Sequence, residues 1–179
     1  MLAQCDVSAT VFRGRDEPTG LVMADFTKAV VSAPGKERFA RAPFGGRVII
    51  HATAEETGGA FGMWETFTPP GEGPAEHTHT RETEMFRVVS GVYRFRCGDA
   101  QFDGPPGTVV VLPPNVPHSW RNISDEPGRI FATVTPGGFE RLFMEIEATG
   151  ADTPEKIAAI EASLGIVNDE TEKLAAGRK

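Results

Sequence analysis

The chain has 179 residues, of which 40% are hydrophobic and 24% are charged. This length and composition indicate one globular domain with extensions, because enough apolar residues are present for a substantial core. The formal net charge of −7 argues against nucleic acid and anionic membrane surfaces as partners, since both attract basic patches.

The sequence shows no export or membrane signal that would place the protein outside the cytoplasm. No apolar run reaches transmembrane length, and the N-terminus lacks the basic and apolar regions of a signal peptide. Cys5 and Cys97 are too few for a disulfide framework, and two free thiols are typical of the reducing cytosol. We therefore expect a cytoplasmic protein that binds neither nucleic acid nor a membrane.

The composition and periodicity of the sequence change after residue 43. Residues 1–43 show no clear periodicity and end in a stretch rich in proline and glycine, so we expect an N-terminal extension. In residues 44–138, short β-branched and aromatic runs such as "RVIIHAT", "MFRVVSG" and "TVVVLP" alternate with turn signals such as "PPGEGP" and "DEPG". Many short strands at regular spacing predict an all-β antiparallel sandwich or barrel.

Residues 139–179 are expected to form one or two helices and a tail. Apolar residues at helical spacing are Phe139, Leu142, Phe143 and Ile146. In "TPEKIAAIEASLG", Pro154 lies just inside a predicted helix start and Gly165 just past its end. The tail "NDETEKLAAGRK" is polar and is expected to fray. We expect these helices to cover an open end of the barrel or to contact a second subunit.

The stretch "HTHTRETE" holds two of the four histidines of the chain. Side chains alternate along a strand, so His77 and His79 share a face and lie about 6.6 Å apart at about 3.3 Å per residue. Two imidazoles at this spacing can bind one metal ion. Glu84 is five residues past His79, so the intervening "TRET" must turn or bulge if Glu84 is to reach the same site.

His118 lies in a second motif, "PPNVPHSWRN", where it follows a turn and begins an alternating run. His118, Trp120 and Asn122 therefore share one face of a strand. Three imidazoles and a carboxylate form a borderline ligand set that suits iron, manganese, nickel, cobalt, copper or zinc as a divalent ion. Mixed nitrogen and oxygen ligands with open positions favour a catalytic metal over a structural one.

These two motifs resemble the conserved motifs of the cupin superfamily. "GEGPAEHTHTRETEMFRVVSG" fits the first, with its required residues at Gly71, His77, His79, Glu84 and Gly91. "GTVVVLPPNVPHSWRN" fits the second, with its required residues at Gly107, Pro113, His118 and Asn122. Asn115 replaces one motif glycine, and asparagine tolerates the left-handed backbone that a tight turn needs.

The resemblance implies an antiparallel jelly-roll barrel that holds one divalent metal through His77, His79, Glu84 and His118. The wider pattern is similar to small bacterial cupins of the quercetin 2,3-dioxygenase-like group. That similarity implies a dioxygenase that acts on a phenolic or enolisable small molecule with O2, and Glu84 is the candidate to take the hydroxyl proton of the substrate. A homodimer is also expected from the resemblance.

Large inward side chains are the candidates for a substrate pocket. They are Phe86, Val88, Trp120, Trp64 and Phe67, and each of them is also suited to a plain role in the core. Glu65 faces either solvent or the metal, and the solvent side is favoured. Glu76 and Glu82 are expected to be solvated, and no role is assigned to His51.

Two alternatives to the dioxygenase remain open. A metal-dependent isomerase or decarboxylase of a small metabolite would act on an anion, so inward Arg or Lys would be expected. Arg87, Arg94 and Arg96 are predicted to face out, which favours an uncharged or phenolic substrate. A binding module without catalysis is the other alternative, and fold alone does not decide among the three.

Overall fold

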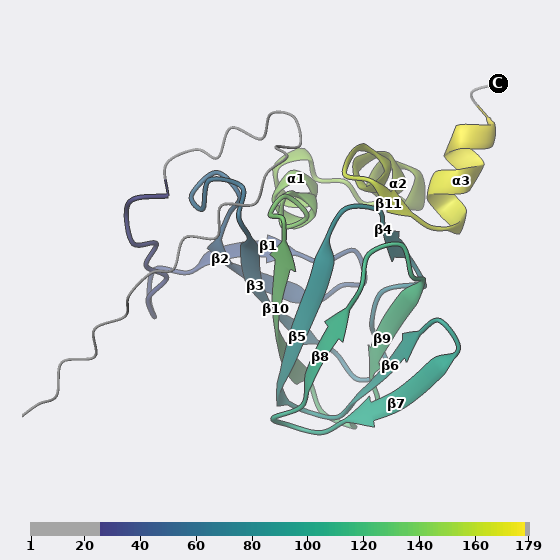
Figure 1. Ribbon diagram of the computed structural model, residues 1–179. Coiled ribbons are helices and arrows are strands. Elements are labelled where there is room, and N and C mark those ends of the chain that lie inside the picture. Colours follow the sequence, from purple (N-terminus) through teal and green to yellow (C-terminus); the bar gives the residue numbers. More distant parts are fainter. Residues whose placement is uncertain (1–25, 178–179) are drawn as a thin grey trace, which may run out of the picture.

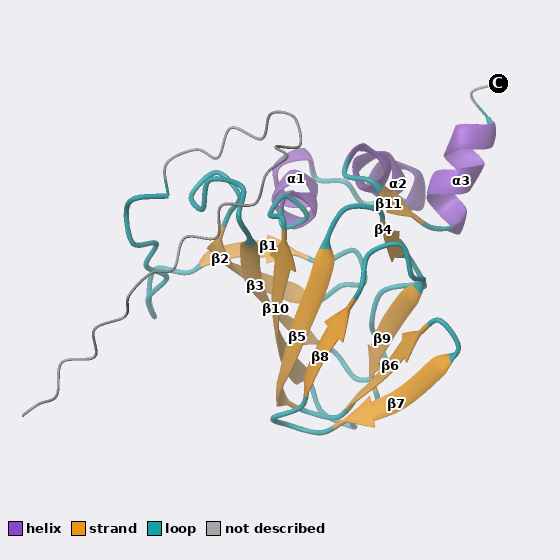
Figure 2. Ribbon diagram, viewed as in Figure 1, coloured by secondary structure: helices purple, strands orange, loops and turns teal. Residues whose placement is uncertain are grey.

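The alternating runs between residues 38 and 135 form two antiparallel β-sheets that pack face to face (Figure 1). The computed structural model describes residues 26–177. Three short helices lie together at one end of the two sheets, and the β6–β7 hairpin lies at the other end (Figure 2). The predicted antiparallel jelly-roll barrel with C-terminal helices is confirmed.

The larger sheet has six strands, and the smaller sheet has three. The order in the larger sheet is β1 (Arg38–Arg41), β2 (Arg47–Ala52), β3 (Gly62–Thr68), β10 (Gly128–Thr135), β5 (Thr83–Ser90) and β8 (Val109–Leu112). The order in the smaller sheet is β7 (Ala100–Gly104), β6 (Tyr93–Cys97) and β9 (His118–Asn122). A short pair is formed by β4 (Thr78–His79) and β11 (Ile166–Val167).

The core lies between the two sheets and is filled by the inward residues of each strand. In β6, Tyr93 and Phe95 are fully buried, while the intervening arginines are exposed, as the alternation predicts. Phe86 of β5 and Trp120 of β9 meet across the barrel with ring centroids 5.9 Å apart. Such an aromatic pair contributes about 1 kcal/mol beyond its buried area.

The helices are α1 (Arg141–Thr149), α2 (Pro154–Ser163) and α3 (Asp169–Ala176). The side chain of Thr153 caps α2 by accepting a hydrogen bond from the Lys156 N–H, and Pro154 occupies the first turn. The expectation of a frayed tail is wrong for α3. Asn168 and Thr171 form a capping box at its start, which satisfies N–H groups that would otherwise lack partners.

The other predictions on the chain termini, the cysteines, membrane segments and the oligomeric state have different outcomes. β1 lies within the segment predicted as an N-terminal extension, and it pairs with β2 in the larger sheet. Cys5 lies outside the described residues, and Cys97 is a free thiol. Among the helices of residues 26–177, none is long and apolar enough to cross a membrane. The homodimer stays a prediction.

Asn115 has the left-handed backbone that the cupin motif normally gives to a glycine. Its φ of 62° is the one positive value among the non-glycine residues described. The Asn115 N–H donates a hydrogen bond to the carbonyl oxygen of His79 at 2.8 Å, so this turn supports the strand that carries His79.

We predict that Asn115→Ala lowers the free energy of unfolding by about 1 kcal/mol, because a Cβ without a compensating polar group is strained at this φ. Asn115→Gly should change stability by only a few tenths of a kcal/mol, about the limit of a urea titration. Urea unfolding of both variants measures the difference. Equal stability of the alanine and glycine variants would show that the turn is not left-handed in solution.

Candidate metal centre

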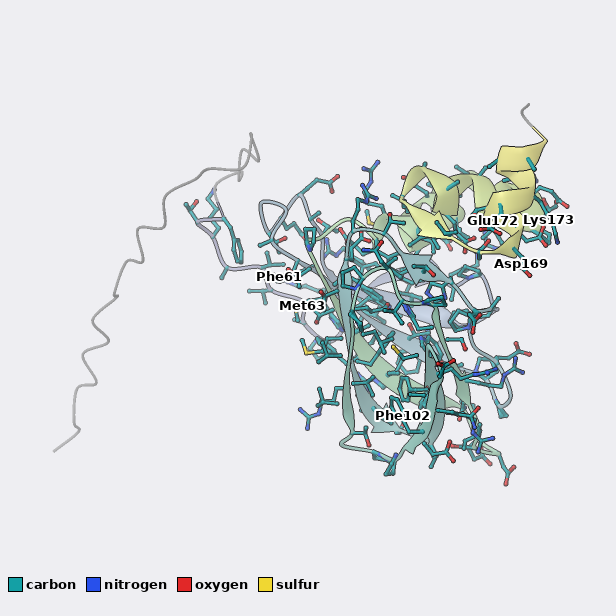
Figure 3. All side chains as sticks on the ribbon, turned by 45° about the vertical axis from the view of Figure 1, so that its right-hand side comes forward. Phe61, Met63, Phe102, Asp169, Glu172 and Lys173 are labelled. Atoms are coloured by element: carbon teal, nitrogen blue, oxygen red, sulfur yellow. The ribbon has the colours of Figure 1, made fainter. Side chains whose placement is uncertain are left out.

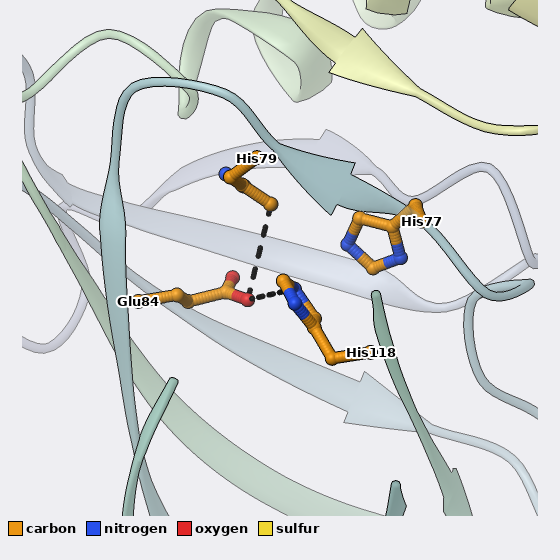
Figure 4. Close-up of side chains that lie close together, drawn as sticks. All are labelled: His77, His79, Glu84 and His118. Carbon is orange, nitrogen blue, oxygen red and sulfur yellow. Dashed lines mark ion pairs between the residues drawn. The ribbon is translucent and has the colours of Figure 1, made fainter. Parts of the chain in front are cut away.

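Four side chains from three segments meet at the helix end of the barrel (Figure 4). His77 precedes β4, His79 ends it, Glu84 lies near the start of β5, and His118 begins β9. The backbone groups of His77 and His118 hydrogen-bond to each other in both directions, at 3.0 and 2.8 Å. This bridge fixes the two halves of the site to each other, although they are far apart in the sequence.

The potential ligand atoms of these four residues all lie within 4.8 Å of one another, and all four residues are buried. The Oε2 atom of Glu84 is 3.4 Å from Nε2 of His118 and 3.9 Å from Nε2 of His79. The predicted turn between His79 and Glu84 is present, because the chain leaves β4 at residue 79 and enters β5 at residue 83. The structure therefore brings together all four predicted ligands.

The tautomers of two histidines are set by backbone carbonyl groups. Nδ1 of His77 is 2.9 Å from the Ala75 oxygen, and Nδ1 of His118 is 2.8 Å from the Val116 oxygen. A carbonyl oxygen only accepts, so Nδ1 carries the proton in both rings. The Nε2 lone pair of each ring is then free to bind a metal ion.

Buried polar atoms without partners converge on the centre of this cluster. Within residues 26–177, no hydrogen-bond partner is present for Nε2 of His79, Nε2 of His118 or Oε2 of Glu84. Buried polar groups are nearly always paired, so this convergence calls for a further group between them. A divalent transition metal fits, because three imidazoles and a carboxylate are its usual protein ligands.

The pKa values in the cluster are shifted in opposite directions. Burial, together with the neighbouring His118 and His79 rings, lowers the pKa of His77 to about 4. Burial also lowers the pKa of His118, but the approach of the Glu84 carboxylate outweighs burial and raises that pKa on balance. For Glu84, burial raises the pKa, but the three imidazoles outweigh it and the pKa is lowered. His77 is thus neutral and Glu84 ionised at neutral pH.

Sequence comparison identifies the barrel. Residues 64–134 match the family model described as the cupin domain, and this match contains all four clustered residues. The barrel has the cupin fold.

Solved structures show the same cupin fold. An RmlC-like cupin from Shewanella frigidimarina has a TM-score of 0.55 and 15% identity, covering 64% of this chain and 96% of its own. KdgF from Halomonas sp. has a TM-score of 0.54 and 15% identity, with 61% and 96% covered. A predicted oxalate decarboxylase from Thermotoga maritima has a TM-score of 0.51 and 18% identity, with 61% and 99% covered. No curated protein matches the chain.

A cavity of about 610 Å³ opens beside the cluster, with His77 and Glu84 in its wall. Its aromatic lining is formed by Phe44, Trp64, Phe86, Trp120, Phe139 and Phe143. The acidic lining residues are Glu76, Glu84, Asp152, Glu161, Asp169 and Glu170, and no Lys or Arg of the described chain lines the cavity. The cupin cavity is therefore aromatic and acidic, with no cationic side chain to bind an anion.

Three of the five predicted pocket residues line this cavity, namely Trp64, Phe86 and Trp120. Val88 is buried at 1% exposure in the core, away from the cavity lining. The structure differs from the sequence prediction at Phe67, which lies on the outer face of β3 against Arg47 and Arg129. The reason is its odd spacing from Trp64, because residues three apart on one strand point to opposite faces.

The outer face of β3 also carries Glu65, which contacts Arg129 and lies 3.8 Å from Nε2 of His51. Glu65 therefore lies on the face away from the metal cluster, as predicted, but it is 8% exposed rather than solvated. Burial lowers the pKa of His51, whose ring stacks on Phe131. His51 takes no part in the cluster.

Glu82 is the site residue that the sequence interpretation missed. It was expected to be solvated, but it is 2% exposed, and its Oε2 atom lies 3.5 Å from Nδ1 of His79. The turn between β4 and β5 moves Glu82 to the inner side, behind the ring of His79. A carboxylate in this position favours the Nδ1–H tautomer and directs Nε2 of His79 to the cluster. The position of Glu82, three residues after His79, was the sequence signal that could have indicated this contact.

The residues lining the cavity from the C-terminal segment were missed as well. Sequence analysis predicted helices that cover one end of the barrel, but it did not predict that Glu161 and Asn168 line the cavity. Asn168 followed by acidic residues is an N-cap signature, which could have revealed α3.

We predict that Glu82→Gln weakens metal binding by about tenfold, because the neutral amide holds the His79 ring less firmly and lowers its basicity. Competition with a chromogenic chelator measures the dissociation constant. Glu55→Gln is the control, since this carboxylate is exposed and does not line the cavity beside the cluster. Equal affinities for the two variants would show that Glu82 does not support His79.

We also predict that metal affinity falls as the pH decreases below the raised pKa of His118. Only a neutral imidazole binds a metal, so a proton competes for His118, whereas His77 with its pKa of about 4 stays neutral. Between about pH 6.5 and about pH 5.5, the dissociation constant for Zn²⁺ should rise about tenfold or more, because at least the proton on His118 competes with the ion. A dissociation constant independent of pH over this interval would contradict the assignment.

Proposed function

We propose that this cupin is a metal-dependent dioxygenase that acts on an uncharged phenolic or enolisable small molecule. The observation that carries the proposal is the cavity beside the cluster, which combines aromatic walls with an acidic lining. Its volume of about 610 Å³ is within the range of small-molecule sites. A planar substrate can lie between the aromatic side chains, which also exclude water.

The side chains of the cluster define the chemistry at the end of this cavity. A bound divalent ion would supply Lewis acidity and, if redox-active, electron exchange with O2. His77, His79 and His118 would hold the ion through nitrogen, and Glu84 would hold it through oxygen. The carboxylate of Glu84 is ionised at neutral pH, because the neighbouring imidazoles lower its pKa. It can therefore accept the proton of a substrate hydroxyl group.

The acidic lining of the cavity disfavours the alternative of an isomerase or decarboxylase that acts on an anion. One neighbouring structure is a predicted oxalate decarboxylase, and oxalate is a dianion. Recognition of a carboxylate normally uses Arg or Lys, and neither lines the described cavity. An anion would also meet the carboxylates of the lining, so an isomerase or decarboxylase of an anionic metabolite fits this cavity poorly. The same cavity would also suit a cupin that binds its ligand without catalysis. A measurement of substrate turnover distinguishes this alternative from a dioxygenase.

We predict saturable oxygen uptake when the protein, reconstituted with iron, nickel, cobalt, manganese or copper, is mixed with flavonols or other enolisable phenols. His79→Ala should lower the rate by about 100-fold or more, because it removes a ligand rather than a group behind one. An oxygen electrode measures the rate.

His51→Ala is the matched control, because His51 lies on the outer face of the barrel and its loss should leave the rate unchanged. Metal content is measured for each sample. Protein that carries about one ion per chain but consumes no oxygen with any of these metals and phenols would contradict the dioxygenase proposal.

A further inference from the structure

One wall of the cavity is built by residues 152–170, which we call the roof. Eight of its residues line the cavity. They are Asp152 before α2, Pro154, Ile157 and Glu161 in α2, Ile166 in β11, Asn168 before α3, and Asp169 and Glu170 in α3. The roof lies beyond residue 134, where the match to the cupin domain ends. Its side chains therefore lie outside the part of the chain that matches the cupin domain.

The roof is attached directly to the strand that carries His79. β11 pairs with β4 in the register Ile166 to His79, and the N–H and hydroxyl of Thr80 donate to the Gly165 oxygen at 3.2 and 2.7 Å. The guanidinium of Arg81 donates to the Leu164 oxygen. These bonds hold the roof at a fixed position relative to the metal cluster.

Glu161 differs from two other carboxylates of the roof in having no cationic partner within the described chain. Asp152 pairs with Lys156 at 2.8 Å, and Glu170 pairs with Lys173 at 2.6 Å. Figure 3 shows Asp169, Glu172 and Lys173 on α3. Glu161 instead accepts one hydrogen bond, at 2.8 Å, from the side-chain amide of Asn168.

The hydrogen bond from Asn168 positions the Glu161 carboxyl group but leaves acceptor capacity unused. The side-chain oxygen of Asn168 caps α3 by accepting from the N–H groups of Glu170 and Thr171, so its amide group is oriented toward Glu161. A carboxylate has about four acceptor positions, and Asn168 uses one of them. Burial raises the pKa of Glu161, against smaller opposing contributions from Asn168 and the nearby His79.

We propose that Glu161 is a specificity-determining residue that accepts a hydrogen bond from a second group of the substrate, a hydroxyl or an ammonium. This inference rests on the proposed function in one respect, because it assigns the substrate to the same cavity. A ligand with a methyl group there would desolvate the remaining acceptor positions of this carboxyl group without filling them, which is unfavourable. A ligand carboxylate would meet like charge, which excludes it more strongly.

The test measures binding without turnover, using protein loaded with redox-inert Zn²⁺. The probes are hydroxybiphenyls whose second ring carries a methyl, hydroxyl, aminomethyl or carboxylate group in the meta or para position. Calorimetry should show the hydroxyl and aminomethyl ligands binding at least about tenfold more tightly than the methyl ligand, with the carboxylate weakest. A comparison of the affinities for the hydroxyl and aminomethyl ligands shows whether Glu161 prefers a neutral or a cationic hydrogen-bond donor.

Glu161→Gln should lower the affinity for the aminomethyl ligand by about tenfold or more, because the charge is lost while the shape is kept. The hydroxyl ligand should lose less, since the amide oxygen still accepts. Glu161→Asp, which keeps the charge, should retain the preference for donors in reduced form. Glu172→Gln is the matched control and should leave the ratios among the four affinities unchanged, because this exposed carboxylate of α3 does not line the cavity.

An unchanged ratio between the affinities for the aminomethyl and methyl ligands in Glu161→Gln would overturn the inference, provided that metal content and melting temperature match those of the unsubstituted protein. This result is independent of the dioxygenase proposal. Selective binding without oxygen uptake would contradict only the proposed function, whereas oxygen uptake without ligand selectivity would contradict only the role of Glu161.

Discussion

The structure depends on the convergence of three buried imidazoles and one buried carboxylate at the helix end of the barrel. His77, His79 and His118 reach this point from two strands, and the backbone bridge between His77 and His118 fixes their separation. Burial makes uncompensated polar groups costly, so the arrangement needs a partner at its centre. Two backbone carbonyl groups orient the rings of His77 and His118 from behind, and the Glu82 carboxyl group lies 3.5 Å behind Nδ1 of His79.

Much of the fold and all four clustered residues could be predicted from the sequence. Alternation placed Tyr93 and Phe95 on one face of a strand, and it placed His118 on the same face as Trp120. Alternation alone would place Glu84 on the face opposite His79, and the resemblance to the first cupin motif assigned it to the site. These predictions succeeded because strand periodicity and turn chemistry are local properties, which a single sequence contains.

The remaining features depend on contacts between distant segments. Glu82 looked like a solvated acid, and only the path of the turn places it against His79. Phe67 looked like a pocket residue, but its strand places it on the outer face. The contribution of Glu161 and Asn168 to the cavity requires the β11–β4 pair, which joins segments more than eighty residues apart. The acidic character of the cavity, on which the proposed substrate class depends, therefore could not be predicted from the sequence alone.

The central claim is that one metal ion binds among His77, His79, Glu84 and His118. Anomalous X-ray scattering from crystals of metal-reconstituted protein, collected on both sides of the absorption edge of the metal, tests it most directly. The account predicts one strong peak per chain, within about 2.0–2.2 Å of the three histidine nitrogens and the Glu84 oxygen. A cluster without a peak, or a peak only at carboxylates of the roof such as Asp169, would contradict it.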